Sequence, residues 1–194
     1  MFNTNDTALL IALPSESQGL FEKENIPVFY TGLGKVNAAL TAMDVIHTTR
    51  CKTIINLGTA GSRAFKTHEL VEVSAFVQRD MDVSPLGFQI GETPFDPLPG
   101  AIELTPHFPE LPKGICGTGD NFETGSPKLY ADLVDMEGYA IAKVCRKMNV
   151  RMISLKYVAD GADHNSHTDW GANLIPGSEK LLQYYKKWVA SAHH

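Results

Sequence analysis

Acidic residues stand close behind apolar runs at three places in the chain. Glu16, Glu137 and Asp160 each come within three residues of the end of such a run. Taken singly, an acid after a strand is most often a helix N-cap or a solvated loop residue. Taken together, one carboxylic acid can protonate a leaving group while another carboxylate activates water. The three residues therefore indicate acid–base chemistry on a small polar substrate.

The apolar runs are predicted to be strands that deliver these acids to one edge of a sheet. Thr7–Leu13, Thr53–Leu57 and Met152–Val158 are short and apolar, as buried strands are. Strands alternate with helical patterns throughout, which predicts an α/β domain with a largely parallel sheet. Ligands of such sheets sit beyond the carboxyl ends of the strands. The length of 194 residues predicts one domain, residues 1–194.

A helix is predicted from about Lys35 to Arg50. Its apolar residues at helical spacing predict the buried face. These residues are Val36, Ala39, Leu40, Met43 and Ile46.

Two glycine pairs are predicted to form turns at strand ends. Gly32 and Gly34 bracket the start of the predicted helix, and Gly58 and Gly61 follow a strand. Such turns can expose backbone N–H groups to an anion or a ribose oxygen, or glycine simply fits a tight turn. Neither pair belongs to a dinucleotide-binding or P-loop pattern.

Composition argues against several classes of partner. The net charge is −5 and there is no block of Lys and Arg, so nucleic acid is not expected. No apolar run approaches the ~20 residues that span a membrane, and the first residues lack the features of a signal peptide. The three cysteines form no disulfide framework. We expect a cytoplasmic protein.

Metal and nucleophilic chemistry have little support in the sequence. His164 and His167 lie near Asp163 and Asp169, so a metal site is conceivable. No third distant ligand is apparent, however, and solvated loop histidines are commoner than ligands, so we predict no metal. The chain has no Gly-x-Ser-x-Gly elbow, and no cysteine has an obvious histidine partner.

Five short segments, in order along the chain, resemble the nucleoside phosphorylase and nucleosidase superfamily, and within it the 5'-methylthioadenosine/S-adenosylhomocysteine nucleosidases. The resemblance runs from about residue 8 to residue 170. It implies a single-domain, three-layer phosphorylase/hydrolase-like fold with a central mixed twisted sheet flanked by helices. It also implies a homodimer that needs no metal or organic cofactor. The segments are Thr31–Ala39, Asn56–Gly61, Thr118–Asp120, Asp135–Gly138 and Lys156–Asp160.

The resemblance also implies a role for each acid. Glu16 falls where the family keeps the carboxylate that activates water, and Asp160 where an acid protonates N7 of the departing adenine. Glu137 would hold the ribose hydroxyls, with Met136 packed beneath the sugar, and Phe122 would stack on the purine. An acid that protonates N7 at neutral pH needs a raised pKa, which burial against an aromatic ring could provide.

Six further residues complete the implied site. Thr59 replaces a small hydroxyl residue near the nucleophile, and Trp170 occupies an aromatic position that closes over the base. Glu123 lies near the base. Val83, Leu86 and Pro94 fall in the stretch that lines the 5'-substituent pocket, partly across a dimer interface.

The implied substrate is an adenine nucleoside, 5'-methylthioadenosine and/or S-adenosylhomocysteine, and two alternatives stay open. Phosphorylases of the superfamily bind phosphate with arginines where this chain has Pro14–Glu16 and Asn56, and a glutamate would repel phosphate. The sequence therefore favours hydrolysis that releases adenine. The alternatives are a futalosine-type or general purine nucleosidase, and a non-catalytic nucleoside-binding protein on the same fold. Retention of both an acid and a base disfavours the binding protein.

Overall fold

The strands form where the sequence is most apolar. The computed structural model describes residues 6–97, 100–123, 128–162 and 170–191. Apolar runs that are buried on both faces form the central strands, as expected for a sheet covered on both sides. The strands are β1 (Thr7–Ile11), β2 (Val28–Tyr30), β3 (Thr53–Ser62), β4 (Leu70–Gln78), β5 (Ile102–Glu103), β6 (Lys113–Thr118), β7 (Leu133–Asp135) and β8 (Arg151–Asp160).

Four of the five helices named here lie between strands in the chain, and the fifth follows the last strand. Two short helices follow β1 directly. The helices are α1 (Pro14–Ser17), α2 (Leu20–Lys23), α3 (Lys35–Thr49), α4 (Gly138–Met148) and α6 (Leu174–Ser191).

The sheet is mixed and partly closed on itself. β3 pairs in parallel with β1 and β8, and β8 pairs antiparallel with β4. β4 continues through β6 to β7 in parallel, and β7 returns antiparallel to the end of β3. The strands β3, β8, β4, β6 and β7 therefore form a closed ring, from which β1, β2 and β5 extend. The prediction of a mixed twisted sheet is confirmed, whereas the closure of the ring was not foreseen.

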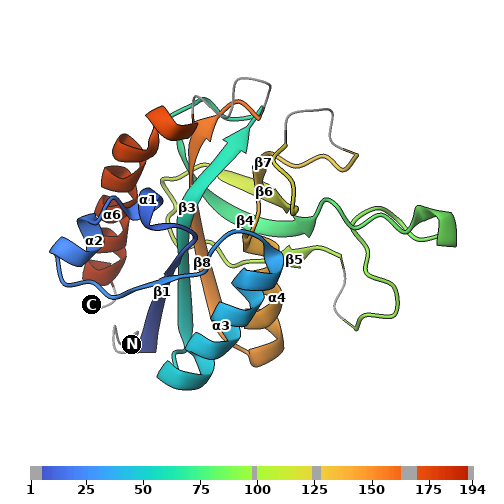
Figure 1. The fold of residues 1–194 in the computed structure, drawn as a ribbon, viewed down its shortest axis with the longest axis horizontal. Helices are drawn as coiled ribbons and strands as arrows, with labels where there is room; N and C mark the ends of the chain where they lie inside the picture. The colour runs from blue at the N-terminus through green and yellow to red at the C-terminus, as the bar shows by residue number, and fades with distance from the viewer. Residues whose placement is uncertain (1–5, 98–99, 124–127, 163–169, 192–194) are drawn as a thin grey trace.

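Helices cover both faces of the sheet, which confirms the three layers (Figure 1). α3 and α4 pack on one face through a core that includes Ala38, Ala42 and Ile141. α6 covers the other face, where Leu181 and Trp188 meet the apolar side chains of β1, β3 and β8. The site described below lies at one end of this sandwich, so its side chains are anchored to packed elements.

Two local predictions were wrong. Gly58 and Gly61 do not form a turn, because β3 continues through them and stays paired with β8 as far as Asp160. Glycine is needed there for close approach rather than for a turn. Val36 and Leu40 of α3 face outwards, because the small residues Ala38 and Ala42 occupy the face against the sheet.

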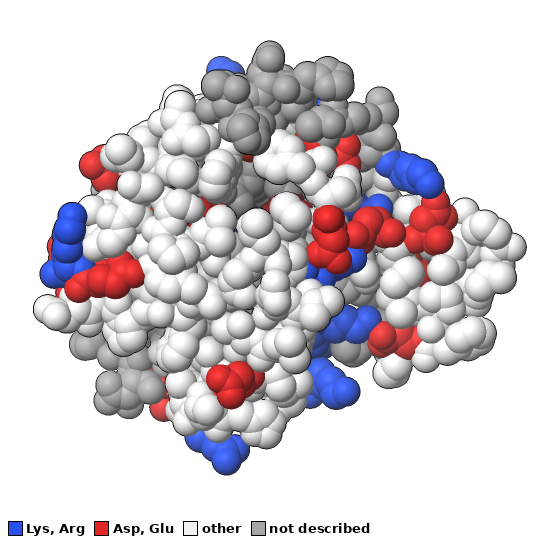
Figure 2. Space-filling view, in the orientation of Figure 1, with Lys and Arg blue, Asp and Glu red and all other residues white. Residues whose placement is uncertain are grey.

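The described residues 79–97 of the segment 79–100, named here the 79–100 loop, leave the body of the molecule (Figure 1). They include a 3-10 turn, Ser84–Leu86. Acidic and basic side chains mix where it joins the body (Figure 2). Among them are the pairs Lys35–Asp80, at 2.6 Å, and Lys128–Asp82, at 2.7 Å. A loop of this length without regular structure is usually functional or part of an interface.

Candidate active site

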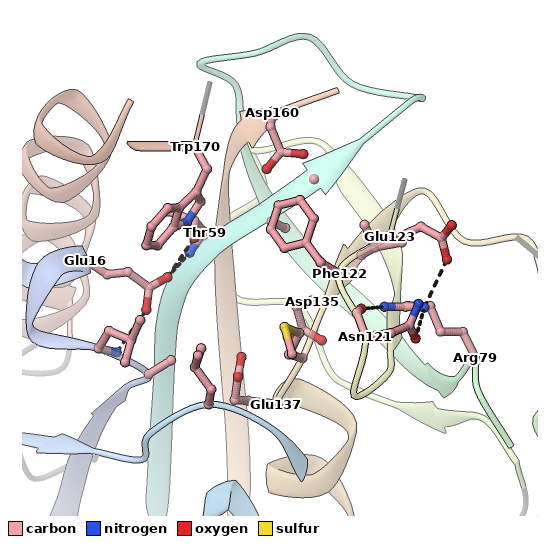
Figure 3. Close-up of a pocket in the computed structure, with 17 residues that line it drawn as sticks. Glu16, Thr59, Arg79, Asn121, Phe122, Glu123, Asp135, Glu137, Asp160 and Trp170 are labelled. Carbon is pink, nitrogen blue, oxygen red and sulfur yellow. Dashed lines mark hydrogen bonds and ion pairs between the residues drawn. The ribbon is translucent and has the colours of Figure 1, made fainter. Parts of the chain in front are cut away.

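A cavity of about 260 Å³ brings the three predicted acids together. Glu16, Glu137 and Asp160 all line it and are all buried. In Figure 3, Glu16 and Trp170 lie on one side of the cavity and Arg79 and Glu123 on the other, with the ring of Phe122 between them. The other lining residues are Ala12, Leu13, Leu33, Thr59, Ala60, Gly61, Asn121, Val134, Asp135 and Met136.

Glu16 lies in α1, directly after β1, and is held by three N–H or O–H donors. The Thr59 backbone N–H donates to Glu16 Oε1 over 2.8 Å, and the Thr59 hydroxyl donates to the same oxygen over 2.7 Å. The Leu13 N–H donates to Oε2 over 3.1 Å. A Cβ at Gly58 would lie 3.3 Å from Oε1, so a glycine in β3 leaves room for this carboxylate.

Asp160 is the last residue of β8 and lies directly against Gly61 of β3. A Cβ at position 61 would lie 2.6 Å from Asp160 Oδ1, closer than the two atoms can approach. The same oxygen accepts the Ala162 N–H over 2.9 Å. β1, β3 and β8 are parallel, so Glu16, Thr59 and Asp160 do reach one edge of the sheet.

Glu137 reaches the cavity from a strand of the opposite direction: it follows β7, which runs antiparallel to β3. The Gly34 N–H donates to Glu137 Oε1 over 2.8 Å, and Gly34 has a positive φ of 88°. The predicted glycine turn at Gly32–Gly34 is thus present, and one of its N–H groups holds a carboxylate of the protein. Burial, followed by the negative charge of Asp135, raises the pKa of Glu137 to about 7.

A buried ion pair lies beside Glu137. Lys156 Nζ is 2.8 Å from Asp135 Oδ2, and both side chains are almost fully enclosed. Asp135 also accepts hydrogen bonds from the Thr118 hydroxyl and the Gly138 N–H. Burial alone would lower the pKa of Lys156, but the charge of Asp135 raises it overall, so the lysine is a fixed cation. This pair anchors the segment that carries Met136 and Glu137.

The aromatic residues lie where a flat ligand could meet them. Phe122 lines the cavity and is 46% exposed, so one part of its ring has no protein cover. Trp170 also lines the cavity, and its indole N–H donates to the Thr59 hydroxyl over 2.9 Å. Apolar faces with a few polar groups around them are typical of small-molecule sites.

Arg79 and Asn121 line the cavity and were not predicted from the sequence. Arg79 Nη1 lies 3.0 Å from Glu123 Oε2 and 3.0 Å from Asn121 Oδ1, and the guanidinium also binds the Asn121 carbonyl. Glu123 also lines the cavity, and its carboxylate faces an arginine. In the sequence, Arg79 and Glu123 carry opposite charges, and each lies next to a segment that was expected at the site. This pair of charges is the signal that could have identified Arg79.

Three predicted residues lie elsewhere. Val83, Leu86 and Pro94 are on the 79–100 loop and do not line the cavity. Their assignment to a pocket that spans a dimer interface stays a prediction. His164 and His167 are outside the described residues. Within the described ranges, no group of three or more His, Cys, Asp or Glu side chains is arranged to hold a metal ion, and no helix is long and apolar enough to cross a membrane.

The fold and the site define a known class of protein. Residues 17–189 match the family model described as Phosphorylase superfamily, and the chain belongs to that family.

Two relatives of this chain are nucleosidases. The chain is 29% identical to the 5'-methylthioadenosine/S-adenosylhomocysteine nucleosidase of Anoxybacillus flavithermus, over 86% of this chain and 81% of that protein. It is 27% identical to the aminodeoxyfutalosine nucleosidase of Helicobacter pylori, over 89% and 83%. These matches confirm the predicted superfamily and an enzyme of the nucleosidase class.

Solved structures of such proteins share the fold. A crystal structure of the Helicobacter pylori 5'-methylthioadenosine/S-adenosylhomocysteine nucleosidase with butyl-thio-DADMe-Immucillin-A has a TM-score of 0.86 at 22% identity, covering 95% of this chain and 97% of that one. The native futalosine hydrolase of Helicobacter pylori has a TM-score of 0.85 at 23% identity, again covering 95% and 97%. The predicted phosphorylase-type fold is confirmed.

Proposed function

We propose that the protein hydrolyses the N-glycosidic bond of an adenine nucleoside, 5'-methylthioadenosine or S-adenosylhomocysteine, and releases adenine. The observation that carries the proposal is the single cavity in which Glu16, Glu137 and Asp160 surround a partly uncovered Phe122 ring. Relatives over most of the chain bear the name of this activity.

The acids divide the work between the two sides of the sugar. Cleavage passes through an oxocarbenium-like sugar, and the base leaves more readily when its N7 is protonated. Asp160 is the acid at N7, and as an aspartate it can also accept from a 6-amino group. Glu16 activates water, and Glu137 holds the ribose hydroxyls above Met136. The purine stacks on Phe122, with Trp170 beside it and Thr59 and Glu123 at the margins.

The charges of the cavity favour water over phosphate as the nucleophile. Of the described residues that line it, Arg79 alone is a cation, and it faces Glu123 and not the open space beside Glu16. Asn56 does not reach the cavity, because its side chain lies in the core against Ser154. Among the described lining residues, a phosphate dianion would meet several carboxylates and no cation other than the paired Arg79.

Leu33 and Met136 line both the cavity and a second hollow of about 300 Å³, which Val36 and Asp120 also line. We propose that the 5'-group lies there, and that Val83, Leu86 and Pro94 of a second copy complete the pocket in a homodimer. A cytoplasmic location is part of this proposal. The three cysteines are buried and form no disulfide, as suits a reducing compartment.

Product analysis tests the proposal. The protein is incubated with 5'-methylthioadenosine, with and without phosphate, and free adenine, methylthioribose and sugar phosphate are separated. We expect adenine and methylthioribose at a rate that phosphate does not change. Release that requires phosphate would contradict the role of Glu16. Adenine release from the E16Q variant at the wild-type rate would contradict it equally.

A futalosine-type substrate is the second candidate, because relatives at 27% identity are named aminodeoxyfutalosine nucleosidases. The same assay with aminodeoxyfutalosine distinguishes the two by their kcat/KM ratio. The third possibility, a nucleoside-binding protein without activity, predicts binding of both nucleosides and release of adenine from neither.

A further inference from the structure

Three side chains form a hydrogen-bonded chain along one wall of the cavity (Figure 3). The Trp170 indole N–H meets the Thr59 hydroxyl over 2.9 Å, and that hydroxyl meets Glu16 Oε1 over 2.7 Å. Trp170 lies 111 positions from Thr59, and Thr59 lies 43 positions from Glu16. Three distant parts of the sequence thus converge on one carboxylate.

These hydrogen bonds can run in only one direction, from Trp170 through Thr59 to Glu16. An indole N–H is a donor and cannot accept, whereas a hydroxyl has one proton and two lone pairs. Since the Thr59 oxygen accepts from Trp170, its own proton is directed at Glu16. Without the indole, the hydroxyl could instead turn to other acceptors or to water.

The two oxygens of Glu16 consequently differ. Oε1 accepts both the hydroxyl and the N–H of Thr59, which occupies its two lone pairs. Oε2 accepts the Leu13 N–H, which leaves it one lone pair among the described residues. Hydrogen bonds donated to a carboxylate favour its ionised form.

We propose that Trp170 is a positioning residue for Glu16, acting through Thr59 so that Oε1 is fully occupied and Oε2 is the oxygen that receives a proton from water. This inference rests on the proposed function, since that function makes Glu16 the water-activating group. It gives Trp170 a role beyond contact with the ring of a ligand. A phenylalanine ring would make the same contact but has no N–H to donate.

Substitutions at both ends of the chain test the proposal. W170F keeps an aromatic ring and removes the donor. We expect kcat to fall by roughly three- to tenfold, the effect of about one hydrogen bond, with KM changed less than about twofold. The acidic limb of the kcat–pH profile should move to higher pH. Because W170F and T59V break the same chain, the double variant should be no slower than T59V alone.

The control is W188F, which changes the other tryptophan of the chain; Trp188 lies on α6, is buried against the sheet and does not line the cavity. It should leave kcat, KM and the pH profile unchanged. If W170F raises KM and leaves kcat unchanged, Trp170 contacts the ligand but does not position Glu16, and the proposal is overturned. Effects of W170F and T59V that multiply in the double variant would equally overturn the proposal.

Several ionisable groups share this cavity, so the shift of the kcat–pH profile must be assigned to one of them. Asp160, Glu137, Asp135 and the Arg79–Glu123 pair line the cavity. Lys156 Nζ lies near Glu16, since a Cβ at Gly58 would be 3.6 Å from Nζ and 3.3 Å from Glu16 Oε1. T59S keeps the hydroxyl and should have the wild-type kcat–pH profile. The other ionisable groups of the cavity are the same in every variant. A shift of equal size in T59S would assign the limb to one of these neighbours and overturn the proposal.

A second readout does not depend on turnover. In W188F protein, Trp170 is the sole source of tryptophan fluorescence, and its emission should change as Glu16 titrates. The change should disappear in W188F/E16Q and W188F/T59V. If wild-type protein cleaves no nucleoside, the proposed function fails, but this titration still decides whether Trp170 is coupled to Glu16. A titration that survives E16Q overturns the coupling whatever the activity.

Discussion

Glu137 is a carboxyl group that water hardly reaches and that has another carboxylate, Asp135, close by. Its pKa is about 7 in the folded protein, against an ordinary value of 4.5. Below pH 4.5 the group is protonated in the folded and unfolded chains alike. Between pH 4.5 and about 7 the unfolded chain gives up this proton before the folded chain does, so ionisation draws the equilibrium towards unfolding.

The E137Q variant should therefore be less sensitive to rising pH than the wild type. Each pKa unit corresponds to about 1.4 kcal/mol, so the wild type should lose on the order of 3 kcal/mol relative to E137Q between pH 4.5 and 7.5. Urea unfolding of both proteins across this range measures the difference. Parallel stability curves for the two proteins would show that Glu137 ionises normally.

Asp160 should be needed for turnover and not for folding. In D160N the side-chain oxygen can still accept the Ala162 N–H, but the amide cannot protonate a base. We expect kcat to fall by about 10²- to 10⁴-fold, measured as adenine release, with an unchanged melting temperature. D44N on the exposed side of α3 is the matched control. A D160N rate close to that of the wild type would remove Asp160 from the acid role.

At the scale of elements, the end of β4 and the segment 121–123 are joined by one ion pair. The side chains of Arg79 and Glu123 are only 4% and 11% exposed, and Phe122 lies in the joined segment. Removing one partner of a buried pair costs much more than the pair contributes, because the remaining charge stays buried.

R79M should therefore destabilise the protein by roughly 3–5 kcal/mol, and it should raise KM because the segment that carries Phe122 loses its anchor. R79M/E123M should recover part of the stability. K128A, which removes the exposed partner of Asp82, should cost at most about 1 kcal/mol. Denaturant unfolding and steady-state kinetics test these expectations. If R79M costs no more than K128A, the pair does not anchor the segment.

The sequence predicted most elements and many of the cavity-lining residues, because apolar runs mark strands and acids after them mark strand ends. The helix predicted from about Lys35 to Arg50 is α3, Lys35–Thr49. Two features escaped because they depend on packing between distant segments. Gly58 and Gly61 were read as a turn, since nothing local shows that Glu16 and Asp160 press against them. Arg79 was missed because its partners, Asn121 and Glu123, lie more than 40 positions away.

At the scale of the whole molecule, large apolar side chains remain uncovered in a single chain. Val36 and Leu40 lie one turn apart on α3 and are 70% and 66% exposed. Leu86 and Phe95, on the 79–100 loop, are 72% and 95% exposed. Exposed apolar groups of this kind commonly mark an interface between proteins.

We expect a homodimer that covers Val36 and Leu40, and V36E/L40E should convert it to monomers by placing charges in an apolar contact. The T48E variant, at the far end of the same helix, is the matched control. Sedimentation velocity over a range of concentrations gives the mass of each protein. Wild-type protein that sediments as a single chain at every concentration would contradict the dimer.

The closed ring of strands also has a consequence for how the chain folds. Asn56 of β3 and Ser154 of β8 are hydrogen-bonded neighbours although 98 positions separate them. During synthesis, β3 has to wait for β8 with this edge unpaired, and pairings between such distant segments form slowly. An unpaired edge invites contact with other chains, so changes that weaken β8 should lower the yield of folded protein before they alter catalysis. Because Asp160 is the last residue of β8, the nascent chain places Asp160 and closes its sheet in the same step.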